Sequence, residues 1–132
     1  MSDYLLHIDT SMETAFVGLT KDGIQIDVRI NGIQKEHASF LHPAIQALML
    51  DNNIQLDSLA AISVTEGPGS YTGLRVGLSA AKGLCYALAK PLICINTLHM
   101  IAQAAVAENG NYQGYICPMI DARRLEVFTS LF

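Results

Sequence analysis

The order of hydrophobic periods along the chain is the feature that most constrains the fold. Up to residue 31 the apolar residues form short segments typical of strands, at 4–9, 15–21 and 24–30. Asp22-Gly23 joins the second and third as a hairpin signal. From residue 39 helical spacing begins to alternate with short strands. An antiparallel meander followed by this alternation predicts an α/β fold, a mixed sheet with helices on its faces.

The second half of the chain supplies the alternating elements. Helices are predicted at 39–51, 73–89 and 98–108, and strands at 60–65, 92–96, 115–121 and 127–132. In the third strand Ile24, Ile26, Val28 and Ile30 alternate with polar residues, which indicates one solvent-facing side. The predicted order is therefore βββαβαβα, followed by ββ.

This order is similar to the ribonuclease H-like lobe of the actin and sugar-kinase (ASKHA) superfamily, in which two such lobes are paired. The resemblance implies that residues 1–110 form a ribonuclease H-like N-terminal lobe. Residues 111–132 then form the first strands of a second, incomplete lobe. This division is an analogy at the level of fold and says nothing about function.

Composition leaves some apolar surface to be explained. The chain has 132 residues, of which 51% are hydrophobic and only 15% charged, against about 25% charged in typical soluble domains. Either the core is large for the length, or an apolar surface is destined for a partner. The net charge of -4 with scattered Lys and Arg argues against nucleic-acid binding by the chain alone.

The cysteines and the lack of a long apolar run predict a cytoplasmic location. Cys85, Cys94 and Cys117 are odd in number and lie in apolar stretches, as expected of buried free thiols in a reducing cytoplasm. The most apolar stretch, 73–89, contains two cations and is too short to cross a bilayer. We expect a cytoplasmic protein with no membrane association.

A glycine-rich segment between a strand and a helix is the best candidate for ligand binding. Free N–H groups and the positive end of a helix dipole favour an anion at such a place. The candidate phosphate-binding residues are Gly67, Gly69, Ser70, Thr72 and Gly73, with Thr72 as the expected helix cap. The segment matches neither a Walker loop nor a dinucleotide fingerprint. A tight turn without a ligand explains the same residues equally well.

No set of residues points to catalysis. Asp9 and Glu66 could meet at neighbouring strand ends, but a two-metal nuclease needs three or four clustered carboxylates. His37 and His42 are five residues apart, which is not the i, i+4 spacing of a helical metal site. We therefore expect no catalytic residue, no metal site and no cofactor.

The helix at 73–89 carries small residues at every fourth position. Gly73, Gly77 and Ala81 recur in this way, although a glycine inside a helix costs about 1 kcal/mol relative to alanine. Close packing explains that cost, either on the chain's own sheet or a neighbouring helix, or on another subunit.

Four segments resemble the TsaB (YeaZ) family in the same order and spacing. They are Ile8-Asp9-Thr10-Ser11, Glu36-His37-Ala38-Ser39, the block from Gly67-Pro68-Gly69 to Gly77, and Ile120-Asp121-Ala122-Arg123. The resemblance implies a non-catalytic scaffold subunit of the complex that makes threonylcarbamoyladenosine in tRNA. The related catalytic family, TsaD, has two metal-binding histidines at positions occupied here by Thr97 and Ile101, so the resemblance implies no metal in this chain.

The same resemblance implies partners. They are a TsaD-like catalytic subunit and a TsaE-like ATPase, with tRNA reached only through the complex and a homodimer formed when the chain is alone. The helices of the first lobe would make the interface. The expected contacts are Leu41, Ile45, Leu48, Leu74, Val76, Gly77 and Leu78. Two alternatives stay open: an ATP-binding phosphotransferase or ATPase of the actin superfamily, and a glycoprotease-like metallopeptidase, which the missing histidines disfavour.

Overall fold

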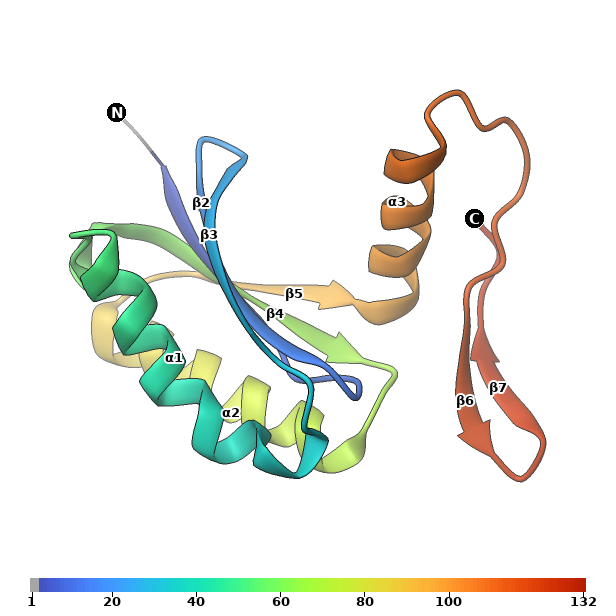
Figure 1. The fold of residues 1–132 in the computed structure, drawn as a ribbon, viewed down its shortest axis with the longest axis horizontal. Helices are drawn as coiled ribbons and strands as arrows, with labels where there is room; N and C mark the ends of the chain where they lie inside the picture. The colour runs from blue at the N-terminus through green and yellow to red at the C-terminus, as the bar shows by residue number, and fades with distance from the viewer. Residues whose placement is uncertain (1–2) are drawn as a thin grey trace.

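The structure, a computed structural model, describes residues 3–132. Its strands are β1 Tyr4–Asp9, β2 Ala15–Lys21, β3 Ile24–Asn31, β4 Leu59–Gly67, β5 Leu92–Asn96, β6 Met119–Arg123 and β7 Glu126–Thr129. Its helices are α1 His37–Asp51, α2 Tyr71–Leu88 and α3 Thr97–Asn109, with short 3-10 turns at Gln34–Glu36 and Leu56–Ser58. The predicted order of elements is confirmed (Figure 1).

The first five strands form one mixed sheet in the order β3-β2-β1-β4-β5. β1 pairs antiparallel with β2 and parallel with β4, so that Ile8 lies between Val17 and Val64. β2–β3 is antiparallel and β4–β5 parallel. The meander therefore supplies one half of the sheet and the strand–helix–strand units supply the other, as the change of period predicted.

The core lies between this sheet and the pair α1 and α2, which run along one face (Figure 1). Leu41, Ile45 and Leu48 of α1 are at most 4% exposed there. Their i, i+4, i+7 stripe packs on the chain's own sheet, so these three side chains, expected as partner contacts, belong to the core, although Ile45 also borders a surface cavity described below. Burying each one is worth roughly 1.5–3 kcal/mol.

Helix α3 lies on the other face of the sheet. Met100 of α3 contacts the hydroxyl of Thr65, whose neighbour Val64 belongs to the core on the α1–α2 side. Successive side chains of a strand point to opposite faces, so Thr65 and α3 are on the second face. This face is covered only in part, since α3 contacts β4 and β5.

Strand β3 differs from the expectation. Its apolar side chains Ile24 and Ile30 are 73% and 65% exposed, whereas Asp27 and Arg29 are partly buried beside the end of α1. The polar side of the strand thus faces the helix, and the predicted inside and outside are reversed. The physical reason is that β3 is an edge strand beside the C-terminal end of α1.

The C-terminal strands form a separate two-stranded sheet, β6–β7, which stands beyond α3 in Figure 1. Ile116 and Phe132 extend it by exchanging two backbone hydrogen bonds of 2.9 Å. The Phe132 ring stacks on His99 of α3 at 5.3 Å between centroids. Two expectations need correction: the regular strands are shorter than predicted, and Cys94 and Cys117 are exposed thiols, not buried ones. Within residues 3–132, no helix is long and apolar enough to cross a membrane.

Candidate functional site

The turn after β1 is held by hydrogen bonds to one oxygen of a buried carboxylate. Asp9 is 2% exposed, and its Oδ1 accepts hydrogen bonds from the Ser11 backbone N–H at 2.9 Å and the Ser11 hydroxyl at 2.6 Å. Glu66, which follows Thr65 near the end of β4, is exposed to solvent. The carboxyl group of Asp9 therefore shapes the turn at the strand end.

The glycine-rich segment packs directly on that turn. The Ser70 N–H donates to the Ser11 carbonyl at 2.7 Å. A Cβ on Gly69 would overlap the same carbonyl, and a Cβ on Gly73 would overlap the Thr10 carbonyl. The Thr10 hydroxyl donates to the Gly73 carbonyl. These contacts explain the glycines as a tight turn that lets α2 approach β1 closely.

The start of α2 corrects two further predictions. Ser70, not Thr72, is the helix cap, and its hydroxyl accepts from the Gly73 N–H at 3.3 Å. Gly77 faces the sheet, because a Cβ there would overlap the Thr10 hydroxyl. Gly77 is therefore not available to a partner. The packing of Gly73 and Gly77 on the chain's own sheet is confirmed.

A cleft of about 660 Å³ separates this turn from the β6–β7 hairpin. Gly69, Ser70 and Thr72 line it, whereas Gly73 packs underneath and Gly67 lies against Leu74. The opposite wall includes Arg123, but the lining also carries Glu13 and Asp121. Two carboxylates against one guanidinium make a poor electrostatic match for a phosphate, so phosphate binding remains a prediction.

A second hollow lies on the outer side of α1 and α2. A cavity of about 680 Å³ is lined mainly by apolar side chains, with Ile45 and Met49 as its floor and Leu50, Leu84 and Leu88 at its walls. A smaller cavity of about 350 Å³ adjoins it, since both are bordered by His42 and Leu84. We call this pair of cavities the α1–α2 groove.

Of the expected interface residues, Ile45 and Val76 line this groove. Leu74 packs on the turn at Gly67, and Leu78 is partly buried against the core. The sequence analysis missed other lining residues, which belong to the outward stripe of each helix. They are His42, Gln46, Leu50, Ala80, Gly83, Leu84 and Leu88. The signal that could have found them is Gly83, a helix glycine outside the four-residue series.

Two histidines, His37 and His7, have structural roles. His37 is 2% exposed, and its Nε2 bonds the Met12 carbonyl at 2.8 Å, which ties α1 to the turn after β1. His7 lies between two hydroxyls, with Nδ1 2.6 Å from Ser63 and Nε2 2.9 Å from Thr20. Burial lowers the pKa of His7 below the usual value of a histidine.

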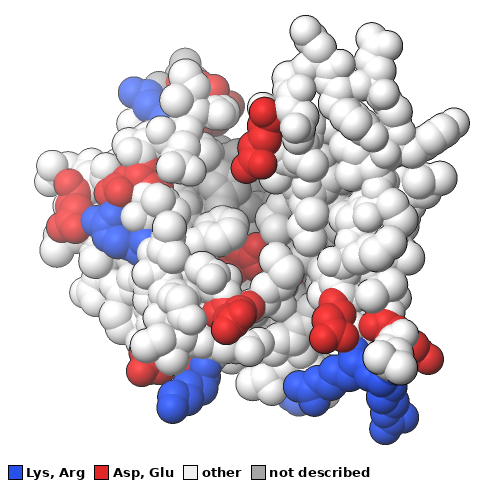
Figure 2. Space-filling view, turned by 45° about the vertical axis from the view of Figure 1, so that its right-hand side comes forward, with Lys and Arg blue, Asp and Glu red and all other residues white. Residues whose placement is uncertain are grey.

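The described residues form neither a large basic patch on the face that Figure 2 presents nor a group of metal ligands. In Figure 2 the Lys and Arg side chains lie at several separate places on the visible face, with Asp and Glu side chains near them. Among residues 3–132 there is no group of three or more His, Cys, Asp or Glu side chains placed to hold a metal ion. Thr97 and Ile101 both lie on α3, where Thr97 is buried.

Comparison with known proteins finds consistent relatives. The family model described as TsaD, tRNA N6-adenosine threonylcarbamoyltransferase, matches residues 26–131. The chain is 35% identical to the tRNA threonylcarbamoyladenosine biosynthesis protein TsaB of Bacillus subtilis over 97% of this chain and 54% of that protein. It is 33% identical to TsaB of Escherichia coli over 94% of this chain and 52% of that protein. The chain thus spans about half the length of these relatives.

Solved structures agree. The structure described as YeaZ from Pseudomonas aeruginosa matches with a TM-score of 0.89 and 32% identity, over 98% of this chain and 60% of that one. The RuvC structure of Thermus thermophilus matches with a TM-score of 0.50 and 12% identity, over 83% and 72% of the two chains, which is a likeness of fold alone. The expected α/β architecture with a mixed sheet is confirmed, and it is the fold of the YeaZ structures.

Proposed function

The chain belongs to the TsaD family, on its TsaB (YeaZ) branch, and we propose that it serves the synthesis of threonylcarbamoyladenosine in tRNA as a docking subunit. The relatives named TsaB support this role, and they do not favour the phosphotransferase or metallopeptidase alternatives. The observation that carries the docking role is the α1–α2 groove.

The groove has the chemistry of a protein interface. Asp57 is the one charged side chain in the described lining of the groove, since neither Asp51 of α1 nor Arg75 and Lys82 of α2 belongs to it. Leu50 at its border is 72% exposed. An apolar hollow with few charges is costly to leave in water and is typical of a surface that another protein covers.

Gly83 gives independent support. Gly73 and Gly77 are explained by contacts with Thr10, but a Cβ on Gly83 would meet nothing within 4 Å. Gly83 lies in the α1–α2 groove beside Ser79 and Ala80. A helix glycine that costs about 1 kcal/mol and has no contact inside the chain is explained when a partner packs closely against it.

An accessory role also agrees with the turn after β1. Asp9 is buried with its Oδ1 bonded to Ser11, whereas Glu66 is exposed to solvent, and among residues 3–132 neither belongs to a group of three or more possible metal ligands. The catalytic partner in this proposal is a TsaD-like subunit, joined by a TsaE-like ATPase. The tRNA is reached only through that complex, and two copies pair through the α1–α2 groove when the partner is missing.

Binding to a purified TsaD-like protein tests the proposal. Leu50→Glu and Gly83→Leu should each weaken the complex at least about tenfold, because one puts a charge and the other a large side chain into the groove. Ile24→Glu is the matched control, since Ile24 on β3 is 73% exposed but lies outside the groove. Isothermal titration calorimetry gives the affinities. Equal affinity of the three variants and the wild type would refute docking through the α1–α2 groove.

A further inference from the structure

The outer edge of β3 is an exposed strand edge with apolar side chains. β3 lies at one end of the sheet, and within residues 3–132 it pairs with β2 alone. Ile24, Ile26 and Ile30 are each more than 40% exposed. A strand edge of this kind is a ready template for another strand unless the protein protects it.

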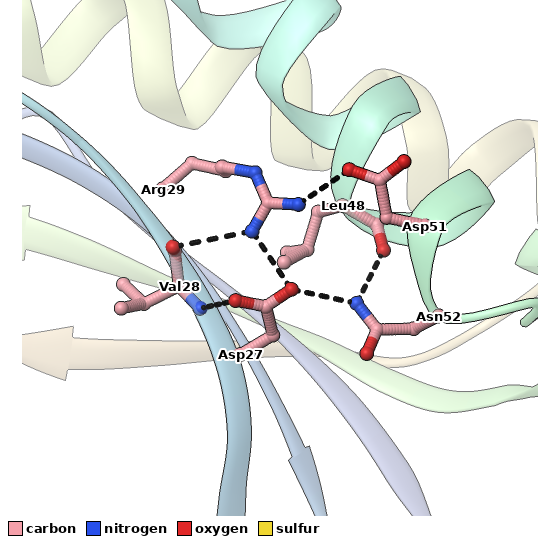
Figure 3. A network of polar contacts seen from close by, with 6 residues as sticks. All are labelled: Asp27, Val28, Arg29, Leu48, Asp51 and Asn52. Atoms are coloured by element: carbon pink, nitrogen blue, oxygen red, sulfur yellow. Dashed lines mark hydrogen bonds and ion pairs between the residues drawn. The ribbon is translucent and has the colours of Figure 1, made fainter.

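Two side chains occupy this edge at its centre (Figure 3). The Asp27 carboxylate accepts a hydrogen bond from the Val28 N–H at 2.8 Å, and Arg29 Nη1 donates to the Val28 carbonyl at 3.3 Å. In an antiparallel ladder the N–H and C=O of one residue point to the same side. Side chains bond both the N–H and the C=O of Val28, so we infer that these two groups point away from β2, toward the free edge of β3.

Helix α1 holds the two side chains in place. Arg29 forms ion pairs of 2.7 Å with Asp27 and with Asp51 at the end of α1. Asn52 donates to Asp27 at 2.9 Å and to the Leu48 carbonyl at 2.7 Å. Hydrogen bonds from Arg29, Asn52 and the Val28 N–H lower the pKa of Asp27 to about 2, so its carboxylate is charged at every physiological pH.

The residues around Val28 are chemically symmetric. An antiparallel pair of two β3 strands centred on Val28 would place Asp27 opposite Arg29, Ile26 opposite Ile30 and Gln25 opposite Asn31 of the second copy. Opposite charges and apolar pairs directly across a ladder are favourable. A two-fold axis produces this register without any further partner. The strand that best fits this edge is therefore β3 of another copy.

We propose that the outer edge of β3 is a strand-pairing site for a second copy of this chain, which Asp27 and Arg29 hold closed by bonding the polar atoms of Val28. A register shift in the β2–β3 pairing adds to the protection, because Ile26 has no partner on β2 between Gln25 and Asp27. Opening the edge requires that the side chains of Asp27 and Arg29 leave Val28. The edge is separate from the α1–α2 groove.

Binding of a labelled peptide with the sequence of residues 24–31 tests the site. The double variant Asp27→Ala/Arg29→Ala should bind it at least about tenfold more tightly than the wild type, since each freed backbone group regains a hydrogen bond worth about 1 kcal/mol. Adding Val28→Pro should abolish the gain, because proline removes the outward N–H. Asp51→Ala is the matched control: it removes an Arg29 contact but leaves both contacts at Val28.

Amide hydrogen exchange of the wild type tests the closed state without any variant. Val28 and Ile30 are two residues apart and direct their N–H groups to the same free edge. The Val28 amide should exchange at least about tenfold more slowly, because the Asp27 carboxylate accepts its hydrogen bond. Equal exchange of the two amides would overturn the closed state, and equal peptide affinity of the wild type and double variant would overturn the pairing site. Neither result depends on binding a TsaD-like protein.

Discussion

Alanine at Gly73 and alanine at Gly83 should change stability in opposite directions. Both residues lie in α2, so the change in covalent structure is the same. The surroundings differ: a Cβ on Gly73 would overlap the Thr10 carbonyl, whereas a Cβ on Gly83 would meet nothing within 4 Å. Because the conflicting atom at Gly73 belongs to the backbone, it cannot move aside by a rotamer change.

The magnitudes follow from the two environments. At Gly73 the overlap of the new Cβ with the Thr10 carbonyl costs roughly 1–3 kcal/mol. Weakening the hydrogen bond from the Thr10 hydroxyl to the Gly73 carbonyl adds about 1 kcal/mol. Helix propensity returns at most about 1 kcal/mol. We expect Gly73→Ala to lower the free energy of unfolding by about 1–3 kcal/mol. Gly83→Ala gains the propensity term alone and should raise it by about 1 kcal/mol.

Urea unfolding followed by circular dichroism measures both variants against the wild type. The m-value should stay the same, so that the shift in midpoint reports stability directly. If Gly73→Ala were as stable as the wild type, α2 would not press on the turn after β1 and the account of the glycine-rich segment would fail. A destabilised Gly83→Ala variant would show a contact inside the chain and remove the argument for a partner at Gly83.

Three further predictions use the same unfolding measurement. Ser70→Ala should cost about 1 kcal/mol as the loss of a helix cap, while Thr72→Ala should be near neutral; the reverse order would restore Thr72 as the cap. Leu48→Ala should lower the free energy of unfolding by roughly 2–5 kcal/mol, because Leu48 is fully buried in the core. A loss below about 1 kcal/mol would contradict the burial of Leu48 in the core. His7 has a lowered pKa when folded, so the unfolded chain binds its proton more readily and stability should fall as the pH drops below about 6.5, by at most about 1.4 kcal/mol per pH unit. In His7→Gln, whose side chain does not titrate, this part of the decline should be missing in urea titrations at pH 7.5 and 5.5, and an unchanged decline would refute the assignment.

Local patterns predicted the elements because their causes are local. The short apolar segment of β2, the Asp22-Gly23 turn and the helical spacing of α1 each depend on neighbours within a few residues, and the structure confirms them. The four segments that resemble the TsaB family likewise predicted the family, which the comparisons confirm. The predicted ends of the two C-terminal strands differ from those of β6 and β7. These strands form a separate two-stranded sheet, in which each has a single neighbour.

The sequence by itself determined the order of elements, the mixed sheet and the family. Which surface each apolar stripe meets was decided only by the tertiary structure. Leu41, Ile45 and Leu48 turn inward, Ile30 turns outward, and of the α2 glycines only Gly83 stays free of contacts inside the chain. The physical reason is that periodicity tells which residues of a helix or strand share a face, whereas the partner of that face comes from residues distant in the chain.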